Sequence, residues 1–193
     1  MLTAAHCATA PDVALHGCQI DPYDWIDTNR TPPACTNRPT MGGVTREHYD
    51  YDLILIDTPG YHRMFDGPRD NGGYYKDVLG WGYHATNELV CQSGVRSGVV
   101  CDLKTGSSTN VSWPSDHPDS DGDWGYTVYG LIKTTQTNGA TAVRGGDSGG
   151  PVFTLQGSGV RAKGSVSAGS GTTMYFQDWA DVIRLYNGYP VTP

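Results

Sequence analysis

The sequence predicts an all-β protein, a sandwich or barrel of many short strands followed by a single C-terminal helix. Gly and Pro occur 26 and 12 times in 193 residues, and they break the chain into short segments. Between these breaks lie short β-type runs that are bounded by turn-forming residues. Helical periodicity is convincing only once, near the C-terminus.

Seven segments have the composition of strands: Asp52–Ile56, Val78–Tyr83, Val99–Leu103, Tyr126–Lys133, Pro151–Leu155, Val160–Ser167 and Thr172–Phe176. In Phe176–Tyr186 the apolar residues instead follow one helical stripe, with Asp178 as a start signal and Gly188 as a stop signal. The Pro-rich segment Asn29–Pro39 is predicted to be a long surface loop, and Thr105–Gly125, which is polar and rich in Pro and Asp, a long loop or a joint between the two halves.

Composition excludes several classes of partner. The net charge is −7 and no basic cluster occurs, so we expect binding neither to nucleic acid nor to a membrane. The longest aliphatic run, Leu53–Ile56, is far too short to span a bilayer, and no signal peptide is visible at the N-terminus. Five cysteines with only four lysines indicate an oxidising compartment, and no zinc-type spacing occurs. We therefore expect a secreted monomer without a metal or cofactor.

The hexapeptide Gly146–Pro151, which reads Gly-Asp-Ser-Gly-Gly-Pro, carries the strongest chemical signal. The hydroxyl of Ser148 is a weak nucleophile until a base removes its proton and N–H groups receive the developing oxyanion. Glycines on both sides allow a tight bend in which two N–H groups point at one spot. A glycine-rich hairpin turn is the non-catalytic interpretation of the same hexapeptide.

The order of residues in the chain selects the kind of triad. The hexapeptide also satisfies the Gly-x-Ser-x-Gly pattern of α/β-hydrolases, in which the acid and then the histidine follow the serine. All histidines here precede Ser148, which excludes that arrangement. No acid precedes His6, which excludes the subtilisin-like order of Asp, His and Ser. The order His, Asp, Ser remains.

The base and the acid are therefore sought upstream of Ser148. His6 is the best base because its small neighbours let an imidazole pack beside a cleft. Asp52 opens a buried apolar run and is the best orienting acid, with Asp50 and Asp57 as its rivals. The other histidines are expected at surface or packing positions: His16, His48, His62, His84 and His117.

Three blocks, Leu2–Cys7, Tyr51–Ile56 and Gly146–Pro151, together resemble the signatures of the chymotrypsin-like serine proteases. Their separations of 46 and 96 residues, counted between His, Asp and Ser, are similar to those of the family. The segment from Cys91 to Cys101 resembles the disulfide hairpin of the bacterial secreted branch, the streptogrisin and α-lytic group. The resemblance covers nearly the whole chain. It implies two six-stranded antiparallel β-barrels, a C-terminal α-helix and serine endopeptidase activity on polypeptide substrates.

The resemblance also implies a role for individual residues. Ser148 would be the nucleophile, His6 the general base and then acid, and Asp52 the group that orients the imidazole. The N–H groups of Gly146 and Ser148 would form the oxyanion hole. Ser167–Gly169 matches the strand that pairs with the substrate backbone.

The primary substrate pocket is expected to be apolar or small. Family members that cleave after Lys or Arg carry an Asp where this chain has Ala142, and Glu-specific relatives carry a His where it has Val166. Arg144 is the one residue that would favour an acidic side chain instead. The expected substrate-binding residues are Ala142, Val143, Gly145, Ser167, Ala168 and Gly169.

The resemblance divides the chain into an N-terminal barrel, residues 1–70, and a C-terminal barrel with the helix, residues 71–193. Family members have strands before the histidine block, so we expect the first barrel to be incomplete. A secreted endopeptidase is the expected function. The alternative is a non-catalytic, protease-like binding module or an inactive fragment.

The same resemblance implies how the cysteines pair. It implies a disulfide between Cys91 and Cys101, and it implies that Cys7 lacks its usual partner. Cys18 and Cys35 then remain as a pair.

In the family, a basic residue often binds the aspartate beside the nucleophile, which is Asp147 here. This chain has Gln92 at the position of that basic residue. Arg96 and Arg144 are the alternative candidates for holding this carboxylate.

Overall fold

The computed structural model describes residues 1–7, 15–16, 40–69, 74–118 and 124–193. The predicted fold class is confirmed, because the chain is built of strands and ends in one short α-helix. The predicted loop Asn29–Pro39 and the predicted Cys18–Cys35 pair lie outside the described residues.

The elements follow one another along the chain as β1 (Leu2–Thr3), η1 (Ala5–Cys7), β2 (Leu15–His16), β3 (Thr40–Gly42), β4 (Val44–His48), η3 (Tyr49–Tyr51), β5 (Leu53–Ile56), β6 (Arg63–Phe65), β7 (Tyr75–Trp81), β8 (Leu89–Gly94), β9 (Gly98–Pro118), β10 (Trp124–Gln136), β11 (Pro151–Gln156), β12 (Gly159–Ser170), β13 (Thr173–Asp178) and α1 (Trp179–Tyr186), where η marks a 3-10 helix.

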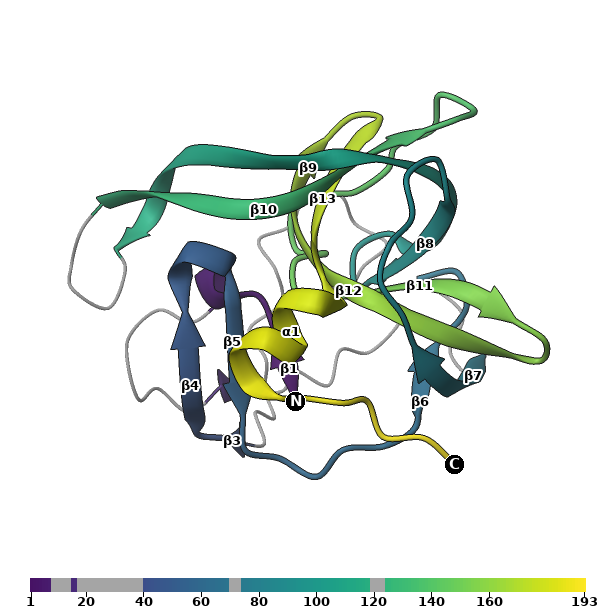
Figure 1. The fold of residues 1–193 in the computed structure, drawn as a ribbon, viewed down its shortest axis with the longest axis horizontal. Coiled ribbons are helices and arrows are strands. Elements are labelled where there is room, and N and C mark those ends of the chain that lie inside the picture. The colour runs from purple at the N-terminus through teal and green to yellow at the C-terminus, as the bar shows by residue number, and fades with distance from the viewer. Residues whose placement is uncertain (8–14, 17–39, 70–73, 119–123) are drawn as a thin grey trace.

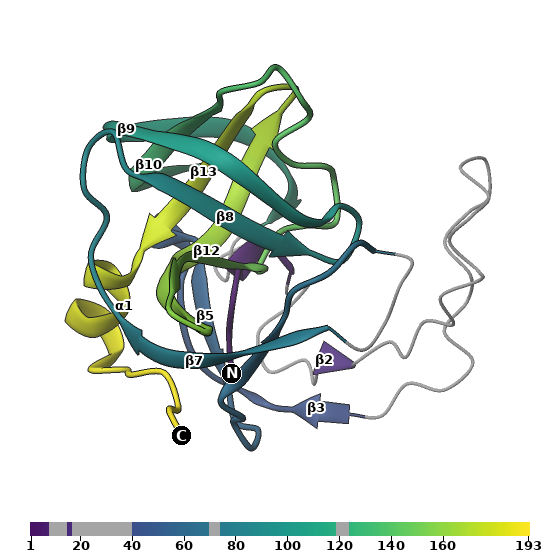
Figure 2. The same ribbon diagram turned by 90° about the vertical axis from the view of Figure 1, so that its right-hand side faces the viewer.

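The strands of the C-terminal half close into a barrel (Figures 1 and 2). Their order is β11-β8-β9-β10-β13-β12, and β12 pairs back onto β11 as far as Ser165, which closes the ring. Branched and aromatic side chains point inward and form the core, which contains Val90, Leu103, Ile132, Val152 and Phe176. β7 and β6 continue the sheet from β12, and β7 runs parallel to β12 rather than antiparallel.

The prediction of a long loop over Thr105–Gly125 is wrong. β9 continues to Pro118, and β10 begins at Trp124 and pairs with β9 in antiparallel fashion. The two strands extend as a long ribbon along the top of the molecule in Figure 1. The segment is polar and rich in Asp and Pro, which favour loops, but its pairing with β10 overrides this local composition.

The N-terminal half contributes a small sheet of order β1-β5-β4. Leu2 lies opposite Leu55 on one side of β5, and His48 lies opposite Leu53 on the other. β5 is the buried centre of this sheet, as its uninterrupted aliphatic run predicts. β2 pairs with β3, and β6 pairs with β7 across the predicted boundary at residue 70.

The helix α1 confirms the one helical prediction and ties the two halves together. The side chain of Asp178 caps its first turn by accepting from the N–H of Ala180 at 2.7 Å. Val182 and Tyr186 on its apolar face pack against Leu53 of β5. A helix at the end of the chain therefore rests on a strand of the first half (Figure 1).

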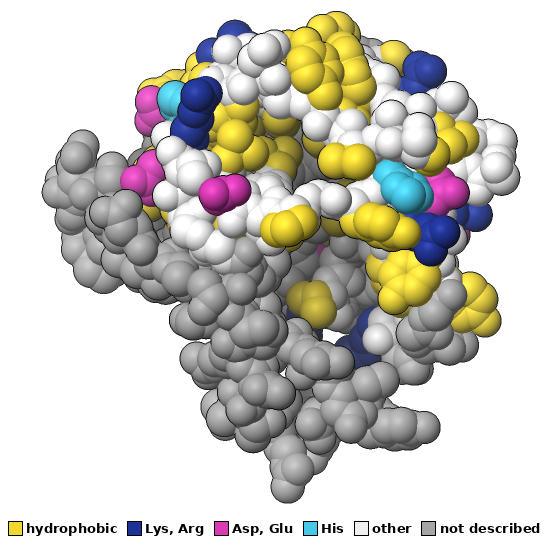
Figure 3. Space-filling model, turned by 90° about the horizontal axis from the view of Figure 1, so that it is seen from below, with side chains coloured by type: hydrophobic (Ala, Val, Ile, Leu, Met, Phe, Trp, Pro, Cys, Tyr) yellow, Lys and Arg dark blue, Asp and Glu magenta, His cyan; other side chains and the backbone are white. Residues whose placement is uncertain are grey.

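The side of the molecule seen from below carries side chains of both charges (Figure 3). Figure 3 shows basic, acidic and hydrophobic side chains interspersed on the side seen from below. Within the described part of the chain, no helix is long and apolar enough to cross a bilayer.

The disulfide between Cys91 and Cys101 is present and links the two strands of the β8–β9 hairpin. Replacing both cysteines by alanine should lower the free energy of unfolding by about 3 kcal/mol, since the closed loop restricts the unfolded chain. Urea unfolding of the double variant measures this loss. Cys7→Ala is the matched control, because Cys7 forms no disulfide. A loss no larger than that of the control would contradict the prediction.

Candidate active site

The partly exposed His6 and the buried Asp52 form a pair at the junction of η1 with β5. The imidazole Nδ1 lies 2.9 Å from both carboxylate oxygens of Asp52, and the backbone N–H of His6 donates to Oδ1 at 2.9 Å. Only 1% of Asp52 is exposed, whereas Asp50 and Asp57 are both exposed. An ionised carboxylate accepts only, so Nδ1 carries the proton and Nε2 is left with its lone pair.

Ser167 joins this pair to Ser148. Its hydroxyl donates to Oδ2 of Asp52, while its main-chain carbonyl accepts from the Ser148 hydroxyl at 3.4 Å. A Cβ placed on Gly149 would lie 1.9 Å from Oγ1 of Thr3, so the serine loop packs directly against the segment that carries His6. The histidine, aspartate and serine chosen from the sequence are therefore gathered in one place, with the serine hydroxyl turned toward Ser167.

The loop around Ser148 has the backbone that its glycines predict. Gly146 and Gly149 have φ values of +95° and +78°, which L-residues with side chains rarely adopt. The N–H of Gly150 donates to the carbonyl of Asp147 at 3.0 Å and tightens the turn. Among the described residues, no backbone carbonyl accepts from the N–H of Gly146 or of Ser148.

Asp147 is held by the turn of the β8–β9 hairpin. Its Oδ1 accepts from the backbone N–H groups of Arg96 and Ser97 at 2.8 and 2.9 Å. Its Oδ2 accepts from the Ser97 hydroxyl at 2.6 Å and from the backbone N–H of Arg144 at 2.7 Å. The two arginines named from the sequence thus contribute main-chain groups, and Ser97 contributes a side chain that sequence reasoning missed. Ser97 stands in no motif that would have singled it out.

The wall between the serine loop and β12 is densely packed. Val143 is 5% exposed and belongs to the core of the second barrel together with Ala142 and Met174. A Cβ on Gly169 would lie 2.5 Å from Cγ1 of Val143 and 2.8 Å from Cα of Met174. A deep slot would leave these wall side chains accessible to water, so any depression here is shallow.

The segment Ser167–Gly169 has one strand neighbour. It pairs with β13, where Gly169 lies opposite Met174. The pairing of β12 with β11 ends at Ser165. Among the described strands, the other edge of this segment is therefore unpaired, and an extended peptide can add to it by main-chain hydrogen bonds.

The surroundings of His6 change its pKa in two opposing ways. Burial lowers the pKa, but the hydrogen bond and the charge of Asp52 together outweigh burial, so the pKa of His6 is raised above its ordinary value of 6.5. The pKa of the neighbouring Cys7 thiol is raised to about 11, first by burial and then by the charge of Asp52. Cys7 is a free cysteine whose Sγ lies 3.9 Å from the carbonyl oxygen of Ser148.

Within the described ranges, no group of three or more His, Cys, Asp and Glu side chains is arranged to hold a metal ion.

The His6–Asp52 pair can be tested by titration. In the wild-type protein, NMR should place the pKa of His6 above 6.5, and Asp52→Asn should lower it because the carboxylate charge is removed while burial remains. His62 is a suitable internal reference, since it lies elsewhere on the surface near Asp77. An unchanged or raised pKa of His6 in Asp52→Asn would contradict the pairing.

Known proteins were compared with the chain at the level of sequence and of structure. No family model and no curated protein matches the sequence. Solved structures do match: Cellulomonas bogoriensis chymotrypsin with 22% identity and a TM-score of 0.64, Nocardiopsis protease with 22% and 0.63, and Thermobifida fusca protease A with 26% and 0.61. The matches cover 100%, 99% and 100% of this chain and 85%, 85% and 84% of those chains. The chain therefore has the fold of the bacterial chymotrypsin-like serine proteases, as its three motifs predict.

Proposed function

We propose that the protein is a secreted serine endopeptidase with Ser148, His6 and Asp52 as its triad. The observation that carries the proposal is the contact of Ser167 with both Asp52 and Ser148, because it gathers three residues from distant motifs around one point. We assign His6 and Asp52 to an N-terminal domain, residues 1–70, and Ser148 to a C-terminal domain, residues 71–193. The disulfide between the hairpin strands supports an oxidising, extracellular location.

Acylation begins when a peptide carbonyl carbon lies beside Oγ of Ser148. Nε2 of His6 accepts the serine proton as Oγ attacks, and the negative charge of Asp52 stabilises the imidazolium that forms. The carbonyl oxygen gains negative charge and is received by the N–H groups of Gly146 and Ser148. His6 then protonates the leaving amine, and the peptide bond breaks.

Deacylation reverses the roles with water in place of the amine. His6 takes a proton from the water, whose oxygen attacks the ester carbonyl of the acylated Ser148. The same two N–H groups stabilise the second oxyanion, and the serine leaves with the proton that His6 returns. During both steps Ser167–Gly169 holds the substrate backbone as an added strand.

The substrate pocket favours a small side chain before the cleaved bond. Val143 fills the space beside Gly169, and Ala142 supplies no charge at the pocket base. Arg144 would favour an acidic side chain, but its Nη1 already donates to the hydroxyl of Ser97 at 3.0 Å. A large side chain would have to displace side chains of the barrel core, and overpacking of this kind costs about 1–3 kcal/mol.

A non-catalytic, protease-like binding module is the second candidate. The orientation of the Ser148 hydroxyl favours it, because the hydroxyl donates to the Ser167 carbonyl instead of to His6. A serine side chain changes rotamer at little cost, however, and triad hydrogen bonds often tighten only when substrate binds. The endopeptidase therefore remains the function that the geometry supports best.

Hydrolysis of an unfolded protein such as reduced casein tests the proposal. The wild-type chain should cleave it, and Ser148→Ala should lower kcat at least about 10⁴-fold, since the nucleophile is lost. Ser158→Ala, at an exposed turn between β11 and β12, should cleave like the wild type. Equal rates for Ser148→Ala and the wild type would show that cleavage comes from another source, and an inactive wild type would favour the binding module.

A peptide library that varies the residue before the cleaved bond tests the pocket. We expect cleavage after small residues such as Ala and Gly, and Val143→Gly should raise kcat/KM for Leu or Phe by about 10- to 200-fold by opening the wall. Val160→Ala, which empties space elsewhere in the barrel core, is the control and should leave the preference unchanged. Strict cleavage after Lys or Arg would contradict this description of the pocket.

A further inference from the structure

The backbone at Asp52 is in an uncommon conformation. Its φ of +50° and ψ of +43° lie in the left-handed region, which few residues other than Gly, Asn and Asp adopt. The residue ends η3, and its N–H donates to the carbonyl of Tyr49 at 2.9 Å. A residue in such a conformation persists only where its neighbours fix it. The residues on either side of Asp52 are both held by α1.

Leu53 is held by the last residue of α1. The hydroxyl of Tyr186 donates to the main-chain carbonyl of Leu53 at 2.7 Å in a buried hydrogen bond. The Leu53 side chain is fully buried against Val182 and Tyr186. A buried carbonyl without a donor is costly, so this hydrogen bond fixes the position of the first residue of β5, directly after Asp52.

Tyr51 is held by the outer face of the same helix. The guanidinium carbon of Arg184 lies 4.3 Å from the centroid of the Tyr51 ring, which is a cation–π contact. Asp181 fixes that guanidinium through hydrogen bonds of 3.1 and 2.6 Å to its Oδ1. Gln177 in turn donates to Oδ2 of Asp181 at 2.5 Å.

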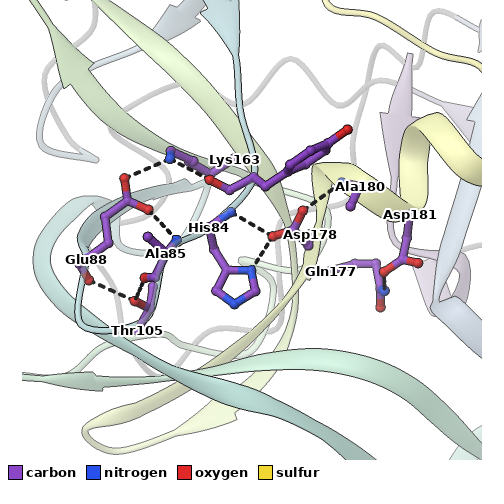
Figure 4. Close-up of polar contacts among 10 residues, drawn as sticks. His84, Ala85, Glu88, Thr105, Lys163, Gln177, Asp178, Ala180 and Asp181 are labelled. Carbon is purple, nitrogen blue, oxygen red and sulfur yellow. Dashed lines mark hydrogen bonds and ion pairs between the residues drawn. The ribbon is translucent and has the colours of Figure 1, made fainter.

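The helix itself is anchored in the second barrel. Asp178 caps it and also accepts from the backbone N–H and from Nδ1 of His84, at 2.8 and 2.5 Å (Figure 4). Lys163 fixes the loop that carries His84 by donating to the carbonyl of Tyr83 and to Glu88. A helix of eight residues is marginal on its own, so its position depends on this cap and on its packing.

We propose that α1 is a positioning element for Asp52, and that the Tyr186 hydroxyl is the positioning residue through which it acts. The inference rests on the proposed function, since it assigns the helix a role in the same triad. Tyr186 touches no reacting group. It holds β5 so that the carboxylate of Asp52 stays within 2.9 Å of the imidazole of His6.

Tyr186→Phe removes the hydrogen bond and keeps the ring. We expect kcat on a peptide substrate to fall about tenfold with KM nearly unchanged, because a displaced Asp52 stabilises the imidazolium less in the transition state. The acid limb of the kcat/KM profile should move to lower pH, because a displaced Asp52 raises the pKa of His6 less. Tyr189→Phe is the matched control, since Tyr189 is exposed and its hydroxyl bonds only weakly to Asn187, at 3.3 Å.

Arg184→Met is the second variant, and it allows the proposal to be tested if Tyr186→Phe does not fold. Arg184 is half exposed, so its replacement should not unfold the chain. The loss of its cation–π contact with Tyr51 should lower kcat, as Tyr186→Phe does. A lower melting temperature with unchanged kcat and an unchanged acid limb in both variants would overturn the inference. An inactive wild type would instead overturn the proposed function, which keeps the two failures apart.

Discussion

The buried carboxylate of Asp52 is the interaction on which the arrangement of the site depends. A carboxylate removed from water is tolerated only when hydrogen bonds satisfy its oxygens. Its donors come from both halves of the chain: the backbone and imidazole of His6 from the first, and the hydroxyl of Ser167 from the second. Satisfying this one charge therefore forces the two halves together, and Ser167 brings the loop of Ser148 with it.

A second buried carboxylate, that of Asp147 next to Ser148, is also satisfied by donors from a distant part of the chain. Asp147 is fixed by a hairpin turn more than 45 residues earlier in the chain, through Ser97 and two backbone N–H groups. Gly94 has no side chain because a Cβ there would lie 2.3 Å from the Asp147 carboxylate. The segment of Ser148 thus lies between two anchored acids, Asp52 through Ser167 and Asp147 through the hairpin turn.

Much of this site could be predicted from the sequence because its parts are local. Three features each act within a few residues of the chain and can be recognised in a short segment: the glycines beside Ser148, the apolar run after Asp52 and the capping Asp178. Partners that are distant in the sequence leave no such local pattern. Ser97 gives no local signal, and the role of Tyr186 depends on a strand more than 130 residues away. The part of β9 beyond Leu103 was mistaken for a loop because Thr105–Gly125 is polar and rich in Asp and Pro, whereas the strand forms through its pairing with β10.

The central claim is that Ser148 is a nucleophile activated by His6. Reaction with a fluorophosphonate, followed by mass spectrometry of the peptides, tests it most directly because the reagent reports activation without a choice of substrate. The account predicts one adduct, on Ser148, formed at a rate that rises with pH as His6 loses its proton above pH 6.5. No adduct on the folded protein, or an adduct on another residue, would contradict it.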